Sequence, residues 1–167
     1  MRASAYSLPF PDGSFDRIVA AEVLEHLVDD SLAMSELARV LKGSGRIAVT
    51  VPRFGPELVN WALSKEYHEV PGGHVRIYRR SHLLGRLRGA GLRPVGRHHA
   101  HALHSPYWWL RCLVGPANED SPLVRAYHRL LVWDITKAPR LTRLPDRWLN
   151  PLMGKSLVVY LEHDERG

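Results

Sequence analysis

The chain has one cysteine and no long apolar segment. Cys112 is the only cysteine among 167 residues, which excludes an internal disulfide, and no metal-ligand spacing accompanies it. Its neighbours Leu110 and Leu113 favour a place in the core. No apolar run approaches the roughly 20 residues of a membrane span, and the N-terminus lacks the apolar core of a signal peptide. We therefore expect a soluble, cytoplasmic protein without redox chemistry.

Lysine is scarce, and acidic residues are missing from one long stretch. The sequence has 19 arginines, 4 lysines and a formal net charge of +6. Between Val70 and Asn118 there are eight arginines and no acidic residue. Such a stretch indicates a nucleic-acid partner where a recognised binding motif accompanies it. No such motif is present, and GC-rich coding DNA alone would produce the arginine excess, so we expect no nucleic-acid partner.

The first 52 residues predict a strand, a helix and a second strand. A turn at residues 9–13 precedes a mostly apolar run, Phe15–Ala21, which suits a strand covered by helices on both faces. Apolar residues at helical spacing follow over Leu32–Leu41, and Gly43 comes next as a C-terminal stop. Arg46–Val51 then indicates a second buried strand. The two strands should be parallel, with a right-handed crossover.

Two more helices and one more strand are predicted in the middle of the chain. Pro56–Ser64 is a short amphipathic helix candidate. Ser81–Ala90 is a clearer helix, with Ser81 as its N-cap and Gly91 as its stop. Arg93–Ala100 has the composition of a strand.

The last third of the sequence departs from this alternation. Residues 101–155 contain scattered prolines and tryptophans in short helical patches, which indicates a helical insertion or cap. The apolar run Leu157–Leu161 predicts a final strand. The expected organisation is one partial domain, with the core elements in residues 1–100, the insertion in 101–155 and the last strand in 156–162.

Polar side chains follow both predicted parallel strands. Glu22, Glu25 and His26 come after the first strand, and Pro52 and Arg53 come after the second. In parallel α/β sheets, ligands bind beyond the carboxyl ends of the strands. The functional site should therefore be sought at this edge.

Three segments in order carry a family resemblance. Ser4–Leu27 reads S-A-Y-S-L-P-F-P-D-G-S-F-D-R-I-V-A-A-E-V-L-E-H-L, Arg39–Pro52 reads R-V-L-K-G-S-G-R-I-A-V-T-V-P, and Gly73–Leu92 reads G-H-V-R-I-Y-R-R-S-H-L-L-G-R-L-R-G-A-G-L. Together they resemble the class I S-adenosylmethionine-dependent methyltransferases, in the small-molecule branch. The resemblance implies an α/β fold, the C-terminal portion of a Rossmann-like sheet, with a parallel core, an antiparallel last strand and a helical insertion before it.

The resemblance also implies the cofactor, S-adenosylmethionine, and methyl transfer to a small or lipophilic acceptor. In this family a glycine-rich loop and an acidic residue that grips the ribose precede the matched segments. Here no G-x-G-x-G follows a strand, so we expect a truncated chain, a fragment of a longer enzyme that binds the cofactor weakly by itself. The alternatives are a non-catalytic remnant or partner subunit and, third, a basic nucleic-acid-binding module. An exposed sheet edge at Phe15–Ala20 would favour pairing with another chain.

The family's cofactor contacts can be carried over residue by residue. By resemblance, Ser4 and Ala5 lie beside the adenine, although the family has an acidic residue where this chain has Ser4. Leu8 lies near the apolar wall of the adenine pocket. Ala21 and Glu22 lie beside the methionine end of the cofactor. For Glu22 the alternative is a carboxylate that only stabilises a helix N-terminus.

His26 is the candidate catalytic residue, because an imidazole can accept a proton from an acceptor hydroxyl. The alternative is a structural histidine bonded to backbone. Glu22, Glu25 and His26, with His74, are similar to a divalent-metal site in some relatives. Many metal-free relatives carry the same letters, and we expect no metal site in this chain.

Adjacent tryptophans stand out in the insertion. Trp108 and Trp109 could line an acceptor pocket, or they could touch a membrane surface that carries a lipophilic acceptor. The alternative is that both rings only pack the insertion onto the sheet.

Overall fold

The computed structural model describes residues 2–67, 69, 73–118 and 120–164. The chain divides into two compact units, each considered by itself below. The first unit comprises Met1–Val51, Tyr78–His98 and Val158–Gly167, and the second comprises Pro52–Ile77 and His99–Leu157. The elements, in chain order, are β1 (Phe15–Ala21), η1 (Leu24–His26), α1 (Asp30–Val40), β2 (Leu41–Pro52), α2 (Phe54–Leu63), α3 (Arg80–Gly89), β3 (Leu92–Ala100), α4 (His104–Val114), α5 (Pro122–Lys137), α6 (Arg140–Met153) and β4 (Ser156–His163).

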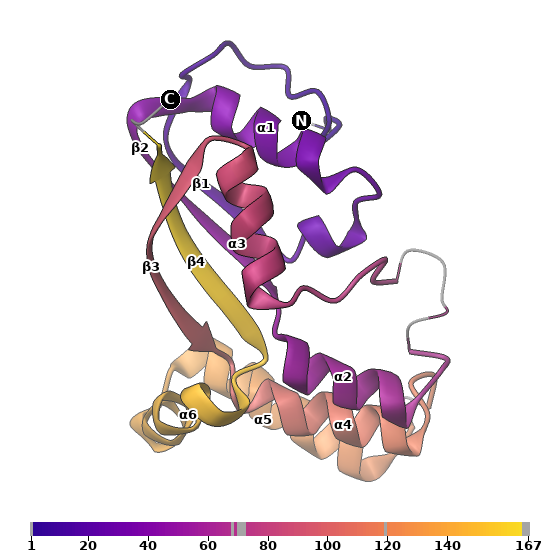
Figure 1. Cartoon of the computed structure of the whole chain (residues 1–167). Helices are drawn as coiled ribbons and strands as arrows, with labels where there is room; N and C mark the ends of the chain where they lie inside the picture. Colours follow the sequence, from indigo (N-terminus) through magenta and orange to yellow (C-terminus); the bar gives the residue numbers. More distant parts are fainter. Residues whose placement is uncertain (1, 68, 70–72, 119, 165–167) are drawn as a thin grey trace. The chain divides into compact units, whose positions relative to one another are not determined.

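The sheet has four strands in the order β1-β2-β4-β3. β1 pairs with β2 in parallel, and Ala21 at the end of β1 lies opposite Thr50. Figure 1 shows the arrow of β4 running opposite to that of β3, so the last strand is antiparallel. The expected parallel core with an inserted antiparallel last strand is confirmed.

Helix α1 buries one face, with Ala33, Met34 and Ala38 among its buried residues, and it contacts α3 and η1. Its N-cap is Asp29, whose carboxylate accepts a hydrogen bond from the amide of Leu32 at 3.1 Å. The helix ends at Val40, so the prediction that Gly43 stops it was wrong, because Leu41 is buried at 2% exposure and already pairs in β2. Gly43 lies within β2.

Helix α3 starts one residue before the predicted cap. Its N-cap position is Arg79, with no side-chain hydrogen bond, so the prediction that Ser81 caps the helix was wrong. Leu83 and Leu87 are fully buried and attach the helix to the core. Gly91, with φ of 78°, follows the helix in the left-handed region, where glycine ends helices at little cost.

Strand β1 is more exposed than a strand with helices on both faces. It stands at the end of the strand order, and Val19 is 73% exposed in the described part of the chain. The prediction of a strand covered on both faces was therefore wrong for the described residues. The apolar composition alone could not show which neighbours cover the strand.

The second unit is helical and contains α2, α4, α5 and α6. Tyr107, Val124 and Leu131 form its buried centre, between α4 and α5. The interval 101–155, predicted to hold short helical patches, instead forms three helices of 11, 16 and 14 residues. Pro145 and Pro151 lie inside α6 without ending it. Among the described residues, no helix is long and apolar enough to cross a membrane.

Candidate functional site

The carboxyl end of β1 carries an unusual backbone geometry. The amide of Glu22 donates to the carbonyl oxygen of Thr50 at 3.0 Å and lies 3.2 Å from its hydroxyl oxygen. These contacts fasten the chain as it leaves β1. Glu22 has φ of 52°, a left-handed conformation that non-glycine residues rarely adopt. Such a residue at the end of a strand marks a candidate functional position.

The side chain of Glu22 adds a second observation. Its Oε1 atom is shielded from solvent and has no hydrogen-bond partner among the described residues. A shielded carboxylate oxygen without a donor is costly, because desolvation is not repaid by a hydrogen bond. The position therefore fits a ligand that brings a donor. Ala21, next to it, is exposed.

A short 3-10 turn, η1, follows Glu22. Glu25 in this turn is fully buried, and its Oε1 atom lies 4.0 Å from the Nε2 atom of His26. The side chain of His26 is 38% exposed, so solvent or a ligand can reach it. The turn thus combines a buried carboxylate with an accessible imidazole.

Buried polar contacts support this turn from within the first unit. The hydroxyl of Tyr78 donates to the carbonyl oxygen of Leu24 at 3.3 Å and also to the carboxylate of Asp30. Arg86 forms an ion pair with the same carboxylate at 2.5 Å. Tyr78 and Asp30 are 2% and 0% exposed. No sequence pattern predicts this network, since its members come from separate parts of the chain.

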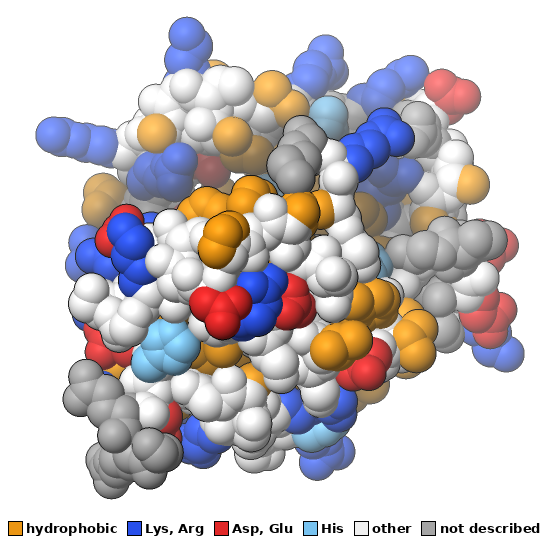
Figure 2. All heavy atoms as spheres, turned by 90° about the horizontal axis from the view of Figure 1, so that it is seen from above, with side chains coloured by type: hydrophobic (Ala, Val, Ile, Leu, Met, Phe, Trp, Pro, Cys, Tyr) orange, Lys and Arg blue, Asp and Glu red, His pale blue; other side chains and the backbone are white. Residues whose placement is uncertain are grey.

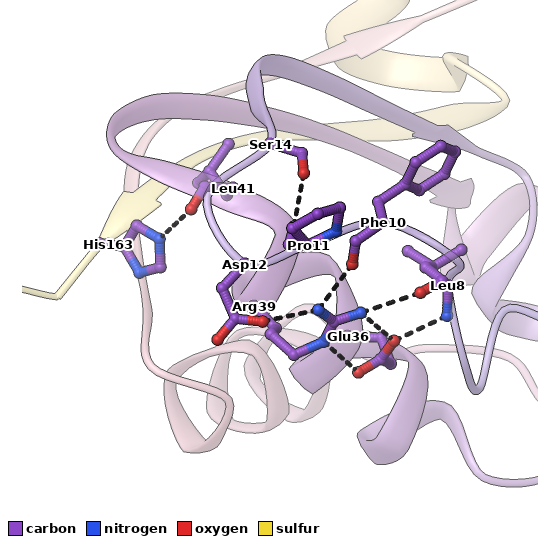
Figure 3. A network of polar contacts seen from close by, with 9 residues as sticks. All are labelled: Leu8, Phe10, Pro11, Asp12, Ser14, Glu36, Arg39, Leu41 and His163. Carbon is purple, nitrogen blue, oxygen red and sulfur yellow. Dashed lines mark hydrogen bonds and ion pairs between the residues drawn. The ribbon is translucent and has the colours of Figure 1, made fainter.

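The N-terminal segment is held by Arg39 of α1 (Figure 3). Its guanidinium donates to the carbonyl oxygens of Leu8 and Phe10 at 3.0 and 2.8 Å. It also donates to Asp12 at 2.7 Å and to Glu36 at 2.7 and 2.9 Å. Glu36 accepts the amide of Leu8 at 2.7 Å. Leu8 is thereby fixed through both of its backbone polar groups.

The charges in this network are coupled. Hydrogen bonds from Arg39 and from the amide of Leu8 lower the pKa of Glu36 to about 2. The same contacts to Glu36 and Asp12 raise the pKa of Arg39 further above its usual range. The segment is therefore anchored by charged groups that stay ionised at neutral pH.

Farther toward the N-terminus, the predicted adenine contacts lie in a turn. The carbonyl oxygen of Ser4 accepts the amide of Ser7 at 3.2 Å, and its hydroxyl accepts the amide of Tyr6 at 3.2 Å. Ser4 is exposed, and Ala5 is half-buried. The hydroxyl of Tyr6 accepts a hydrogen bond from the amide of Val28, just after η1. This bond ties the turn to the end of the chain segment that carries His26.

The second unit has a buried polar cluster of its own. Glu57 of α2 is 1% exposed, and its carboxylate lies 2.6 Å from the Nδ1 atom of His74. Asn60 and Tyr67 donate to the same carboxylate at 3.1 and 3.4 Å. Burial acts to raise the pKa of Glu57, but the hydrogen bond and charge of His74, together with the charge of Lys155 and the hydrogen bond from Asn60, outweigh it and lower the pKa. Burial and the charge of Glu57 raise the pKa of Tyr67.

The insertion's tryptophans and the cysteine make contacts inside the second unit. The indole of Trp109 donates to the carbonyl oxygen of Pro56 at 3.1 Å. Trp108 packs edge-on against Tyr67 with ring centres 5.6 Å apart. Both tryptophans are half-buried. Cys112 is buried, and burial raises its pKa to about 11, which agrees with the expected core position.

The second unit also contains a cavity of about 600 Å³, mostly on α4 and α5. Three arginines and one histidine line it, with no acidic side chain among the lining residues. Its lining consists of Tyr107, Arg111, Val124, Arg125, His128 and Arg129. Trp108 and Trp109 are not among them.

The predicted site residues are divided between the two units. Ala21 and Glu22 share the end of β1, and His26 follows in η1. Arg53, predicted for the same edge, belongs to the second unit, where it donates to the carbonyl oxygen of Leu152 at 3.0 Å. His74 also belongs to the second unit, so the expectation of no metal site stays a prediction. Thr50 was missed, although its place opposite Ala21 follows from the parallel register.

Residues 1–49 match the family described as "Methyltransferase domain". A probable S-adenosylmethionine-dependent methyltransferase of Mycobacterium tuberculosis (strain H37Rv) is 46% identical over 52 residues, 31% of this chain and 19% of that protein. The 27-O-demethylrifamycin SV methyltransferase of Amycolatopsis mediterranei is 33% identical over 107 residues, 64% of this chain and 39% of that protein. The chain thus spans well under half the length of these two relatives.

Among solved structures, a putative methyltransferase from Bacillus halodurans C-125 superposes with a TM-score of 0.56 at 17% identity. The match covers 98% of this chain and 70% of that one. At this identity the likeness establishes the fold alone. Together the three kinds of match confirm the resemblance of the chain to class I S-adenosylmethionine-dependent methyltransferases.

Proposed function

We propose that the chain takes part in S-adenosylmethionine-dependent methyl transfer to a small or lipid-like acceptor. The observation that carries the proposal is Glu22, with its left-handed backbone and its shielded, unpartnered carboxylate oxygen at the end of β1. The methionine end of the cofactor carries an ammonium group, which is the donor that this oxygen lacks. A charge-assisted hydrogen bond of this kind is stronger than a neutral one.

The other cofactor contacts proposed are those of the N-terminal segment. Ala21 leaves room beside Glu22, because it is small and exposed. Leu8, half-buried and fixed by Glu36 and Arg39, offers an apolar surface to the adenine. Ser4 and Ala5 lie in the same anchored segment and are assigned to the adenine edge. When bound, S-adenosylmethionine supplies a methyl group on a sulfonium centre.

His26 is the proposed catalytic residue, acting as a general base. Its accessible imidazole would take the proton from an acceptor hydroxyl and leave the electron pair of the broken O–H bond on the acceptor oxygen. The buried carboxylate of Glu25, 4.0 Å away, would stabilise the imidazolium that results. The other groups of the site would align the acceptor and exclude water.

Nucleic-acid binding is less well supported than methyl transfer. Two arginines of the basic stretch are paired with acids within the first unit: Arg86 pairs with Asp30, and Arg93 lies 3.6 Å from Glu162. Figure 2 likewise shows acidic and basic side chains side by side in the middle of the face that it draws. Paired arginines have less charge available for phosphates, which supports a small-molecule or lipophilic acceptor instead.

Titration of the isotope-labelled chain with S-adenosylmethionine, followed by backbone amide chemical shifts, tests the proposal. We expect saturable shift changes at Ala21, Glu22 and Thr50, whether binding is tight or weak. Amides in α5 and α6 serve as the internal control and should not move. Changes confined to α5 and α6, or absent at a cofactor concentration of several millimolar, would refute the assignment.

A further inference from the structure

Helix α6 is amphipathic in the reverse of the usual sense. A surface helix normally turns its apolar face to the core and its polar face to water. In α6 the large apolar side chains are the exposed ones, with exposed fractions of 76% for Leu141, 57% for Leu144, 82% for Trp148 and 76% for Leu152. These residues are spaced by three, four and four positions, so they form one stripe along the helix. We call Leu141, Leu144, Trp148 and Leu152 the outer stripe.

The opposite side of α6 is polar and is used for attachment within the second unit. Asp146 accepts the amide of Leu103 at 3.1 Å, and Asn150 accepts the amide of Ala102 at 2.9 Å. Thr142, 7% exposed, donates to the carboxylate of Asp134. The spacing of four residues from Thr142 to Asp146 to Asn150 puts all three on one face. This face is satisfied by hydrogen bonds, so the outer stripe is not needed to hold α6 in place.

Positive charge borders the outer stripe along one flank. At 100° per residue, Arg140, Arg143 and Arg147 fall on the same side of the helix, next to the stripe. Arg143 lies 3.8 Å from Asp134. Neither Arg140 nor Arg147 has an ion-pair partner in the described part of the chain. The one acidic residue of α6, Asp146, is bound to backbone on the inner face.

We propose that the outer stripe and its arginine flank dock the protein on an anionic phospholipid surface. A helix with apolar residues on one side, an exposed tryptophan and bordering arginines suits the plane between headgroups and acyl chains. Arginines at this level attract anionic headgroups. A two-fold contact through α6 would bring the like-charged arginine flanks of both copies into one interface, which disfavours self-association. The proposed occupant is therefore a lipid surface and not a second copy. The inference does not depend on the proposed methyl transfer.

Sedimentation of the full chain with lipid vesicles tests the proposal. The probes are vesicles of phosphatidylcholine alone and vesicles with about one third phosphatidylglycerol. We expect binding to the anionic vesicles and little binding to the neutral ones. The Arg140→Gln/Arg147→Gln variant should bind about 30-fold more weakly, because each arginine near an anionic surface contributes about fivefold to the affinity. The Arg80→Gln/Arg88→Gln variant, which changes two exposed arginines of α3, should bind as the wild type does.

The apolar contribution needs a separate variant. Replacement of Leu144, Trp148 and Leu152 by glutamine should weaken vesicle binding by about 100-fold or more. The matched control replaces Leu113, Leu123 and Ile135 by glutamine. These three residues of α4 and α5 are 68%, 61% and 61% exposed. Circular dichroism melting curves check that both variants fold.

Two results would overturn the proposal. One is equal binding to anionic vesicles by the wild type and by the variant with glutamine in place of Leu144, Trp148 and Leu152, which we call the outer-stripe variant. The other is a concentration-dependent dimer in sedimentation velocity that only the outer-stripe variant abolishes, with no vesicle binding by the wild type. The second result would assign the stripe to self-association.

Discussion

Tyr78 should stabilise the first unit through its hydroxyl group, not only through its ring. The hydroxyl donates to Asp30, which is fully buried, and to the carbonyl oxygen of Leu24 in η1. In Tyr78→Phe the ring remains, and the carboxylate loses one donor while Arg86 stays in place. A buried acceptor that loses a donor costs about 1–3 kcal/mol. We therefore expect the free energy of unfolding to fall by about 2 kcal/mol.

Thermal unfolding followed by circular dichroism measures this loss. For a chain of this length, about 2 kcal/mol corresponds to a Tm lower by roughly 4–8 °C. Amide hydrogen exchange should also become faster in η1, because the carbonyl oxygen of Leu24 loses its tyrosine partner. Tyr160→Phe is the matched control, since the ring of Tyr160 stacks on His98 and its hydroxyl has no hydrogen bond among the described residues. Equal Tm values for the two variants would refute the reasoning.

Three further predictions concern separate features. The pKa of Glu36 is lowered from 4.5 to about 2, so the stability that its ion pair contributes is present above pH 4.5 and is lost as the pH falls toward 2; the protection of the amides of Leu8, Phe10 and Asp12 against hydrogen exchange, taken relative to the unstructured rate at each pH, should fall over that window, and unchanged protection would contradict the anchor. Cys112, with a pKa of about 11, should react with iodoacetamide at neutral pH about 300-fold more slowly than a free thiol with pKa 8.5, and stoichiometric labelling within minutes would contradict its burial. Gly91→Ala should destabilise by about 1 kcal/mol through its positive φ alone, whereas Gly89→Ala, in α3, should be neutral or stabilising; equal melting temperatures would contradict the difference.

The order of strands and helices was predictable where the hydrophobic periodicity agrees with the residues that mark the ends of the elements. Phe15–Ala21 is a strand with the predicted bounds, and Gly91 ends α3 through its left-handed backbone. The prediction that Gly43 stops α1 was wrong, because Leu41 is buried in β2 and the helix ends before the chain reaches the glycine. Local composition favours a stop at glycine, but pairing with β1 decides where the strand begins.

The site was predictable only in part. The end of a parallel strand predicts that Glu22 lies at a ligand-binding edge, but the positive φ and the unpartnered carboxylate oxygen require the folded backbone. Tyr78, Asp30 and Arg86 could not be linked in advance, because their contacts join η1, α1 and α3. The sequence also could not show that the apolar face of α6 is the exposed one, since the periodic pattern indicates two faces but not which of them is buried.

Cofactor affinity of the Glu22→Gln variant tests the central claim most directly. Glutamine keeps the size of the side chain and the left-handed backbone, so the melting temperature should not change. It removes the negative charge that pairs with the ammonium group, which is worth about 1.5–3 kcal/mol in a charge-assisted hydrogen bond. The dissociation constant for S-adenosylmethionine, measured by the amide shifts of Ala21 and Thr50, should rise about tenfold or more in Glu22→Gln and stay unchanged in Glu66→Gln, where the glutamate is exposed in the second unit. Equal dissociation constants for wild type and Glu22→Gln would contradict the assignment of this strand end to the cofactor.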